Sequence, residues 1–302
     1  MMLFATQSYE RFGRRLCEAV GGAWGEIERA VFPDGERYHR ILTPPNGPTV
    51  LVGGTVSDED TLELFDLAYA LVEMGAPELT LCIPYYGYST MERAVKPGEV
   101  VKAKTRAVVF SALPARVRLW LLDLHTEGLP YYFDAHLRTR HLYAKNVIVE
   151  ACKRLGGDDF VLASTDSGRA AWVASLSREI GCDAGFAYKR RSGAHTALLG
   201  INADVKNRTV VIYDDMIRTG GSLIEAAKAY RDAGAERIVA VATHGVLPGR
   251  APQVIRDSGV LTALAVTDSH PRVERLPTDE FFNVFSVVPV YAEALLSLKT
   301  TS

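Results

Sequence analysis

A short polar segment directly after an apolar run is the part of the sequence whose residues are best suited to chemistry. Residues 210–213 (VVIY) are typical of a buried strand, and two adjacent carboxylates, Asp214 and Asp215, follow them. The next residues of interest are Arg218, Thr219, Gly220, Gly221 and Ser222, directly before a stretch with helical apolar spacing. Because ligands of open α/β sheets bind at the carboxyl ends of strands, this segment predicts a ligand site.

The residue types of this segment favour a sugar phosphate as the ligand. A glycine-rich turn that enters a helix presents free backbone N–H groups at the positive end of the helix dipole, which suits a phosphate dianion. Gly220 and Gly221 allow close approach of the backbone, and Thr219 and Ser222 can add hydroxyl donors. The two carboxylates can accept hydrogen bonds from the vicinal hydroxyls of a sugar. Arg218 either adds positive charge or faces solvent.

A purely structural interpretation of the same segment is a helix N-cap next to ordinary strand-end aspartates. Adjacent carboxylates repel each other, and their place beside a buried strand therefore favours the ligand site over this alternative. The chain contains neither a Walker A pattern nor GxGxxG, so a P-loop or a dinucleotide-binding fold is not supported.

Strand-like and helix-like segments alternate along the chain, which predicts an α/β fold with parallel sheets covered on both faces. The expected strands are residues 49–53, 79–83, 119–122, 160–164, 209–213, 237–241 and 284–289. The expected helices are residues 8–20, 58–74, 141–155, 168–180 and 221–233.

The two halves of the chain have a similar order of elements. TVLVGG, a helix and APELTLCIP in the first half correspond to TVVIYDD, a helix and AERIVAVAT in the second, with Gly75 and Gly234 ending the two helices. Any two strand–helix–strand units have some likeness, but the match favours two similar domains. We place them at residues 1–147 and 148–302.

The composition is that of an ordinary globular protein. The 302 residues are 48% hydrophobic and 23% charged, with a formal net charge of −2. We therefore expect no nucleic-acid or membrane partner. Four scattered cysteines without a CxxC pair indicate reduced thiols, so we expect a cytoplasmic protein without a disulfide framework.

Motifs along essentially the whole chain resemble those of ribose-phosphate diphosphokinases (phosphoribosyl diphosphate synthases). In chain order they are FPDGE (32–36), IPYYGY (83–88), DLH (123–125), YYFD (131–134), STDSG (164–168), YKRR (188–191), DDMIRTGGS (214–222) and ATHGV (242–246). Each motif is weak alone, whereas the ordered set is specific. The resemblance implies two domains of the type I phosphoribosyltransferase fold and transfer of a diphosphoryl group from ATP to ribose 5-phosphate.

The resemblance also implies roles for individual residues on the two substrates. The ATP side would be held by Phe32, Asp34, Gly35 and Glu36, with Arg93 as a further contact. The ribose 5-phosphate side would be held by Asp214, Asp215 and the run from Arg218 to Ser222. An ATP site shared between subunits implies a homo-oligomer, a dimer or a hexamer.

Metal binding and catalysis are implied in the same way. His125 and Asp166 would bind Mg²⁺, with Asp123 as a further ligand, and a sparse protein shell suits Mg²⁺ because waters and phosphates complete it. Lys189 and Arg191 match a catalytic basic pair on a mobile loop that closes over the transferred group. Read as ordinary structure, His125 is a core histidine, Asp166 a helix cap and residues 189–191 a solvated basic turn.

The chain departs from the family pattern at three places. Thr90 and Met91 stand where the family has an Arg-Gln pair that contacts ATP, Arg169 replaces the second glycine of the Pro-Asp-x-Gly-Gly run, and Arg218 replaces an aspartate. Two alternatives to a diphosphokinase therefore stay open. One is a non-catalytic homologue that binds phosphorylated ligands or regulates a partner synthase, and the other is a phosphoribosyltransferase that consumes phosphoribosyl diphosphate.

Overall fold

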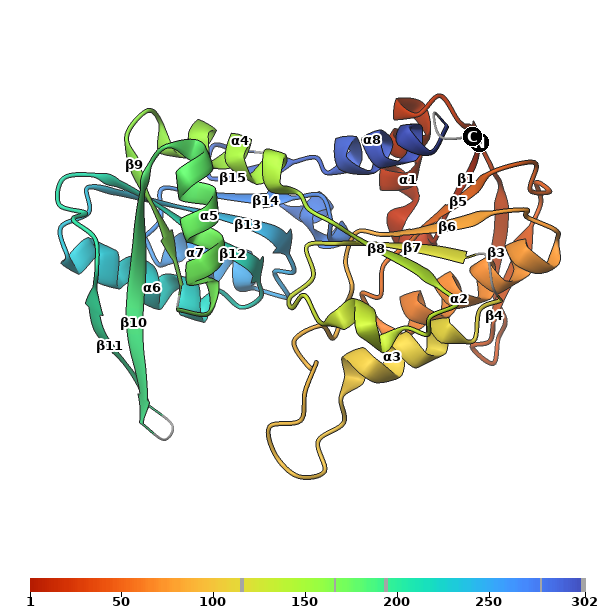
Figure 1. The fold of residues 1–302 in the computed structure, drawn as a ribbon, viewed down its shortest axis with the longest axis horizontal. Coiled ribbons are helices and arrows are strands. Elements are labelled where there is room, and N and C mark those ends of the chain that lie inside the picture. The colour runs from red at the N-terminus through yellow and green to blue at the C-terminus, as the bar shows by residue number, and fades with distance from the viewer. Residues whose placement is uncertain (115–116, 166, 193–194, 278, 300–302) are drawn as a thin grey trace. The chain divides into compact units, whose positions relative to one another are not determined.

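The computed structural model describes residues 1–114, 117–165, 167–192, 195–277 and 279–299. They form two compact units, unit 1 (Met1–Tyr143 and Val287–Ser302) and unit 2 (Ala144–Ser286), each built on one sheet (Figure 1). Within the described ranges, no helix is both long and apolar enough to cross a bilayer.

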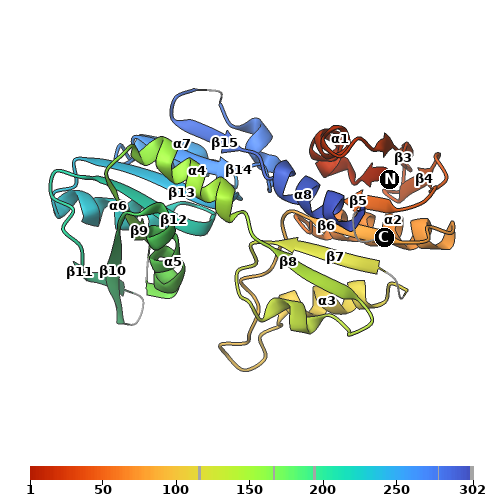
Figure 2. The ribbon, with the colours of Figure 1, turned by 45° about the horizontal axis from the view of Figure 1, so that its top comes forward.

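The sheet of unit 1 has six parallel strands in the order β2-β1-β5-β6-β7-β8. The strands are β1 (Met2–Ala5), β2 (Ala23–Trp24), β5 (Thr49–Val52), β6 (Leu79–Ile83), β7 (Val117–Leu122) and β8 (Arg138–Leu142). A separate antiparallel hairpin, β3 (Ile27–Val31) and β4 (Arg37–Ile41), lies beside α2 in both overall views (Figures 1 and 2).

Helices cover both faces of this sheet (Figure 1). They are α1 (Glu10–Ala19) and α8 (Val288–Lys299) on one face, and α2 (Asp58–Glu73) and α3 (Lys102–Ser111) on the other. Ser57 is the N-cap of α2, its hydroxyl accepts a hydrogen bond from the Asp60 backbone N–H at 3.0 Å, and the acidic first turn suits the helix dipole. Leucines of α2 and Phe110 of α3 pack against the β strands in one buried core.

The sheet of unit 2 has seven strands in the order β11-β10-β9-β12-β13-β14-β15, and all neighbours are parallel except β10 and β11. The strands are β9 (Phe160–Ser164), β10 (Asp183–Ser192), β11 (His195–Ile201), β12 (Thr209–Ile217), β13 (Arg237–Gly245), β14 (Ala263–Thr267) and β15 (Phe282–Phe285). The helices are α4 (Lys145–Gly156), α5 (Ala170–Ile180), α6 (Gly221–Asp232) and α7 (Ala251–Asp257).

The predicted α/β fold with two similar, mainly parallel sheets is confirmed, whereas the division of the chain differs from the predicted one. The chain passes to unit 2 at Ala144, close to the predicted boundary, but its last helix returns to unit 1. Tyr291 of α8 is fully buried there, 6.1 Å from the ring of Phe12, and its hydroxyl donates to the Trp120 carbonyl at 3.5 Å. The C-terminal helix thus completes the core of unit 1 rather than that of unit 2.

Candidate active site

The carboxylates Asp214 and Asp215 lie on strand β12 itself, which continues to Ile217 rather than ending at residue 213 as predicted. β13 runs equally far and pairs with this extension, with Asp214 opposite Ala242 and Met216 opposite His244. β9 stops earlier, where its Ser164 pairs with Tyr213. The two carboxylates therefore lie beyond the end of β9, at the carboxyl edge of the sheet where ligands are expected.

Asp214 is held by its neighbours and is half-buried. Thr165, the residue after β9, donates its hydroxyl to Asp214 Oδ2 at 2.9 Å, and the Asp215 backbone N–H donates to Asp214 Oδ1 at 2.9 Å. Burial and the charge of Asp215 raise the pKa of Asp214 well above its ordinary value of 3.8. The carboxylate pair thus holds a proton at a higher pH than an exposed aspartate does.

Asp215 forms a buried ion pair with Arg169. Arg169 ends the short 3₁₀ helix Ser167–Arg169, and its Nη2 lies 2.6 Å from Asp215 Oδ2. Neither Thr165 nor Arg169 was predicted as a site residue. The signal was available, since both belong to the stretch that follows the predicted strand 160–164 at the same sheet edge.

The start of α6 forms a backbone cradle next to the carboxylates. Gly220 is the N-cap, with φ of +83° and no capping side chain. A Cβ atom there would come within 2.4 Å of Ile255 Cγ1, so the position requires glycine for conformation and for packing. A Cβ at Gly221 would meet nothing nearer than Thr219 Oγ1 at 4.0 Å, which leaves open space over the first turn. This arrangement can accept an anion at the helix N-terminus.

The remaining side chains of the predicted sugar-phosphate loop are solvent-exposed. Arg218, Thr219 and Ser222 are all exposed, whereas Gly220 is buried. The loop therefore turns its polar groups toward solvent at the sheet edge while its glycine packs on α7. Such a site is open to an incoming ligand, as a substrate-binding loop needs to be.

The predicted catalytic pair lies on a hairpin rather than in a loop. Lys189 and Arg191 belong to β10, and their side chains lie outside the described residues. β10 pairs with β9 only as far as Phe186, and from Ala187 to Ser192 it pairs with β11 alone. The backbone hydrogen bonds of this ladder hold the segment extended, and the hairpin runs past the end of the sheet (Figure 1).

The predicted ATP residues of the FPDGE segment form the turn between β3 and β4. The Phe32 N–H donates to the Glu36 carbonyl at 2.8 Å, the Glu36 N–H donates to Asp34 Oδ1 at 3.1 Å, and Gly35 adopts φ of +95°. Phe32 is 48% exposed and packs against the ring of Tyr38 at 5.9 Å. The turn thus presents an aromatic face and a carboxylate to solvent.

An ion pair fixes this hairpin to the body of unit 1. Arg29 Nε lies 2.8 Å from the buried Glu63 Oε1, and Arg29 Nη2 donates to the Ala5 carbonyl at 2.6 Å. The tip of the hairpin is therefore exposed while its base is anchored.

Arg93, the predicted further ATP contact, lies on the long connection between β6 and α3. Its side chain is 79% exposed, and its guanidinium lies 3.4 Å from Glu92 Oε1, a surface ion pair of small energetic weight. Thr90 is half-buried and Met91 is exposed in the same connection. Arg93 and Met91 therefore present a guanidinium and a thioether to solvent. Neither Thr90 nor Met91 offers the donor groups of the Arg-Gln pair in the family pattern.

The predicted metal ligands belong to different parts of the chain. Asp123 follows β7, is buried and adopts φ of +38°, and its N–H donates to the Leu142 carbonyl at 3.0 Å. His125 is half-buried in unit 1, and Asp166 lies outside the described residues, so their joint binding of Mg²⁺ stays a prediction. In the part of the chain that is described, no three His, Cys, Asp or Glu side chains converge as a metal site would require.

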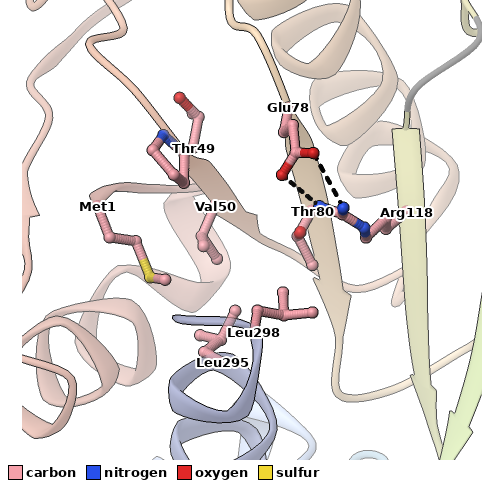
Figure 3. Close-up of a pocket in the computed structure, with 9 residues that line it drawn as sticks. Met1, Thr49, Val50, Glu78, Thr80, Arg118, Leu295 and Leu298 are labelled. Carbon is pink, nitrogen blue, oxygen red and sulfur yellow. Dashed lines mark hydrogen bonds and ion pairs between the residues drawn. The ribbon is translucent and has the colours of Figure 1, made fainter. Parts of the chain in front are cut away.

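A pocket of about 270 Å³ lies in unit 1, at the edge of its sheet where the amino ends of β5 and β6 lie (Figure 3). Thr49 and Thr80, near the starts of β5 and β6, line it together with Leu295 of α8. Arg118 donates to both carboxylate oxygens of Glu78 at its rim, at 2.8 and 3.1 Å. Because substrates of parallel sheets bind at the carboxyl ends, this amino-end pocket is not the candidate active site.

The raised pKa of Asp214 predicts a pH-dependent stability of the ligand-free protein. A carboxyl whose pKa is higher in the folded than in the unfolded state contributes stability below its unfolded pKa and loses it as the pH rises through the folded pKa. We therefore expect Asp214 to make Tm fall between about pH 4 and pH 7, and Asp214→Asn to flatten this slope. Thermal unfolding of both proteins across that range measures it, and parallel slopes would contradict the assignment.

Comparison with known protein families gives matches to both halves of the chain. Residues 1–113 match the family described as the N-terminal domain of ribose phosphate pyrophosphokinase. Residues 190–295 match the phosphoribosyl synthetase-associated domain.

Relatives of similar length match the whole chain. A ribose-phosphate pyrophosphokinase of Methanopyrus kandleri is 34% identical, with 99% of each chain covered. One from Campylobacter jejuni is 31% identical, with 97% of this chain and 94% of the relative covered. The crystal structure of phosphoribosylpyrophosphate synthetase from Mycobacterium smegmatis has the same fold, with a TM-score of 0.87 at 24% identity over 100% of this chain and 99% of that one.

Proposed function

The chain belongs to the ribose-phosphate pyrophosphokinase family, and we propose that it transfers the diphosphoryl group of ATP to the 1-hydroxyl of ribose 5-phosphate. The products are phosphoribosyl diphosphate and AMP. The observation that carries the proposal on this chain is the carboxyl edge of unit 2. There, two carboxylates on β12 precede a glycine N-cap whose helix start is open to an anion.

Each half of this site suits one part of ribose 5-phosphate. The first-turn N–H groups of α6 and the exposed Thr219 and Ser222 hydroxyls suit the 5-phosphate. Asp214 and Asp215 suit the sugar hydroxyls, which donate to carboxylate oxygens. The phosphate loop and the carboxylates would then fix the sugar at both ends and leave its 1-hydroxyl toward the second substrate.

The reaction breaks one P–O bond and forms another. The 1-oxygen of ribose 5-phosphate attacks the β-phosphorus of ATP, the bond from that phosphorus to the oxygen bridging to the α-phosphorus breaks, and AMP leaves. The hydroxyl proton is lost to solvent or to a basic group. Lys189 and Arg191 on the β10–β11 hairpin would stabilise the charge that builds on the transferred group.

Mg²⁺ fits the donor set that the family resemblance assigns to it. Asp123 and His125 at the end of β7 offer one carboxylate and one imidazole, and Asp166 offers a second carboxylate. Because Mg²⁺ keeps several waters and binds substrate phosphates, it does not need a converged protein cage. Bound there, it would neutralise phosphate charge, while the residues of the chain hold and orient the substrates.

The turn between β3 and β4 is the proposed nucleotide contact and also the proposed contact with a second subunit. Its exposed apolar side chains, Val31, Phe32 and Tyr38, extend from an anchored base and would be stabilised by a neighbouring copy. The chain would therefore act as a homo-oligomer.

Replacement of Phe32 by alanine tests the nucleotide role. Loss of an aromatic platform for the base should raise the KM for ATP by about 10- to 100-fold while changing the KM for ribose 5-phosphate less than about twofold. Tyr69→Ala removes an aromatic ring that is 45% exposed on α2 and serves as the control. Equal KM values for ATP in the wild type and Phe32→Ala would contradict the role.

A donor panel separates the enzyme from a non-catalytic homologue. The protein is incubated with ribose 5-phosphate, Mg²⁺ and each of ATP, GTP and CTP, and nucleoside monophosphate release is followed by chromatography. Thr90 and Met91 bear on the donor preference, and release from at least one donor is expected. Intact ribose 5-phosphate binding without release from any donor would support the regulatory homologue instead.

A further inference from the structure

Arg169 forms an ion pair with one of the two predicted sugar-binding carboxylates. Its Nη2 lies 2.6 Å from Asp215 Oδ2, and the two side chains are only 15% and 6% exposed. Both residues belong to unit 2, on the loop after β9 and on β12. A pair at this depth orders both side chains and is weakly screened by salt.

The position of Arg169 in the helix does not account for this charge. Arg169 is the N-cap of α5, with φ of −103° and ψ of 5°, and its side chain makes no capping hydrogen bond. A cation at the positive end of a helix dipole is unfavourable. The opposite charge of Asp215 offsets this cost. The arginine therefore stabilises the carboxylate of Asp215 rather than the helix.

An aromatic contact near Arg169 packs α5 against β12. Trp172, three residues after Arg169, stacks on the ring of Tyr213 with centroids 5.4 Å apart and an interplanar angle of 24°. Tyr213 directly precedes the two carboxylates and is buried. The arginine is therefore held over the strand end by an aromatic contact close to it on α5.

The ion pair changes the state of the neighbouring carboxylate as well. Burial and the charge of Asp215 raise the pKa of Asp214, and the guanidinium of Arg169 opposes that rise. Without Arg169, the pKa of Asp214 would rise further, and a protonated Asp214 oxygen would be a donor instead of an acceptor over a wider pH range. Sugar hydroxyls need acceptors in fixed positions.

We propose that Arg169 is a positioning residue for ribose 5-phosphate, which fixes the Asp215 carboxylate so that the sugar hydroxyls can donate to the Asp214–Asp215 pair. The proposal rests on the proposed function of the same site. It assigns a role to the position at which this chain carries an arginine where the family pattern has a glycine.

Three variants test the proposal. Arg169→Gln keeps much of the length and the hydrogen-bonding ability but removes the charge, whereas Arg169→Lys keeps the charge and loses the planar fork. Arg208→Gln is the matched control. Arg208 also forms ion pairs in unit 2, at 2.6 Å to Asp159 and 2.6 Å to Asp183, but it precedes β12 at the opposite, amino edge of the sheet.

The readouts are the Kd of ribose 5-phosphate by calorimetry without nucleotide, the KM values of both substrates, and Tm. We expect Arg169→Gln to weaken ribose 5-phosphate binding by about 10- to 100-fold with the KM for ATP within about twofold, and Arg169→Lys to recover most of that loss. Arg208→Gln should lower Tm without changing the ribose 5-phosphate Kd.

Two results would overturn the proposal. One is an unchanged or tighter ribose 5-phosphate Kd in folded Arg169→Gln, and the other is an Arg169→Lys variant as impaired as Arg169→Gln. If Arg169→Gln is too unstable to study, Arg169→Lys alone decides, because a weakening beyond about tenfold would contradict a role carried by charge. A wild-type protein that binds no ribose 5-phosphate would instead refute the proposed function.

Discussion

Replacement of Lys189 by alanine is expected to lower kcat by about 10³-fold or more, by analogy with other cations that stabilise a transferring phosphoryl group. The Kd of ribose 5-phosphate should stay within about twofold of the wild type, because the sugar-phosphate loop of α6 and the β12 carboxylates are untouched. Discontinuous assays of AMP release measure kcat, and calorimetric titration with ribose 5-phosphate measures its Kd.

Lys228→Ala provides the control for this prediction. Lys228 is an exposed lysine on α6 in the same unit, so its removal changes the overall charge equally without touching the hairpin. Its kcat should match that of the wild type. Equal losses of kcat and of ribose 5-phosphate affinity in Lys189→Ala would show that Lys189 binds the substrate in its ground state and is not confined to the transition state.

Replacement of Gly220 by alanine should destabilise unit 2 by about 2–4 kcal/mol, since a side chain is strained at positive φ and overpacks a buried site. The φ of Gly220 is +83°, and a Cβ would lie 2.4 Å from Cγ1 and 2.7 Å from Cδ1 of the fully buried Ile255. Urea unfolding of the variant and the wild type measures the change in the free energy of unfolding.

The adjacent glycine separates stability from binding. Gly221 is the first residue of α6, and a Cβ there would meet open space. The urea concentration at the unfolding midpoint should therefore be the same for Gly221→Ala and the wild type. It should nevertheless weaken ribose 5-phosphate binding by roughly 10-fold, because the methyl group occupies space beside the first-turn N–H groups that bind the phosphate. Unchanged stability in Gly220→Ala, or unchanged affinity in a folded Gly221→Ala, would contradict the cradle described for this loop.

The buried strands could be predicted closely from the sequence. β6 and β9 match the predicted residues 79–83 and 160–164 at both ends, because each is a short apolar run bounded by polar residues or proline. β12 and β13 are longer than predicted, since their last residues pair with each other beyond the end of β9. Such an extension depends on the partner strand and has no signature in either segment alone.

The last predicted strand shows where periodicity fails. Residues 284–289 read as one apolar run, but β15 ends at Phe285 and α8 starts at Val288. Pro289 is unfavourable within a strand because it has no N–H to donate to the ladder, but it is tolerated in the first turn of a helix. The packing of Tyr291 into unit 1 favours the helix over a continued strand. This is a tertiary contact, so the local sequence pattern does not reveal it.

The candidate site could be predicted in part for the same reasons. The carboxylate pair and the glycine turn are contiguous, so their spacing alone indicated a sugar-phosphate loop. The contact between Arg169 and Asp215 joins residues brought together only when β9 and β12 pair. A basic residue at the start of a predicted helix was the one local hint, since it opposes the helix dipole.

We propose above that this chain makes phosphoribosyl diphosphate from ribose 5-phosphate and ATP. ³¹P nuclear magnetic resonance of the purified protein with both substrates and Mg²⁺ tests it most directly. We expect a new diphosphate attached at C1 of ribose 5-phosphate, formed in equal amount with AMP. Formation of ADP, or AMP with free pyrophosphate and unchanged ribose 5-phosphate, would contradict it.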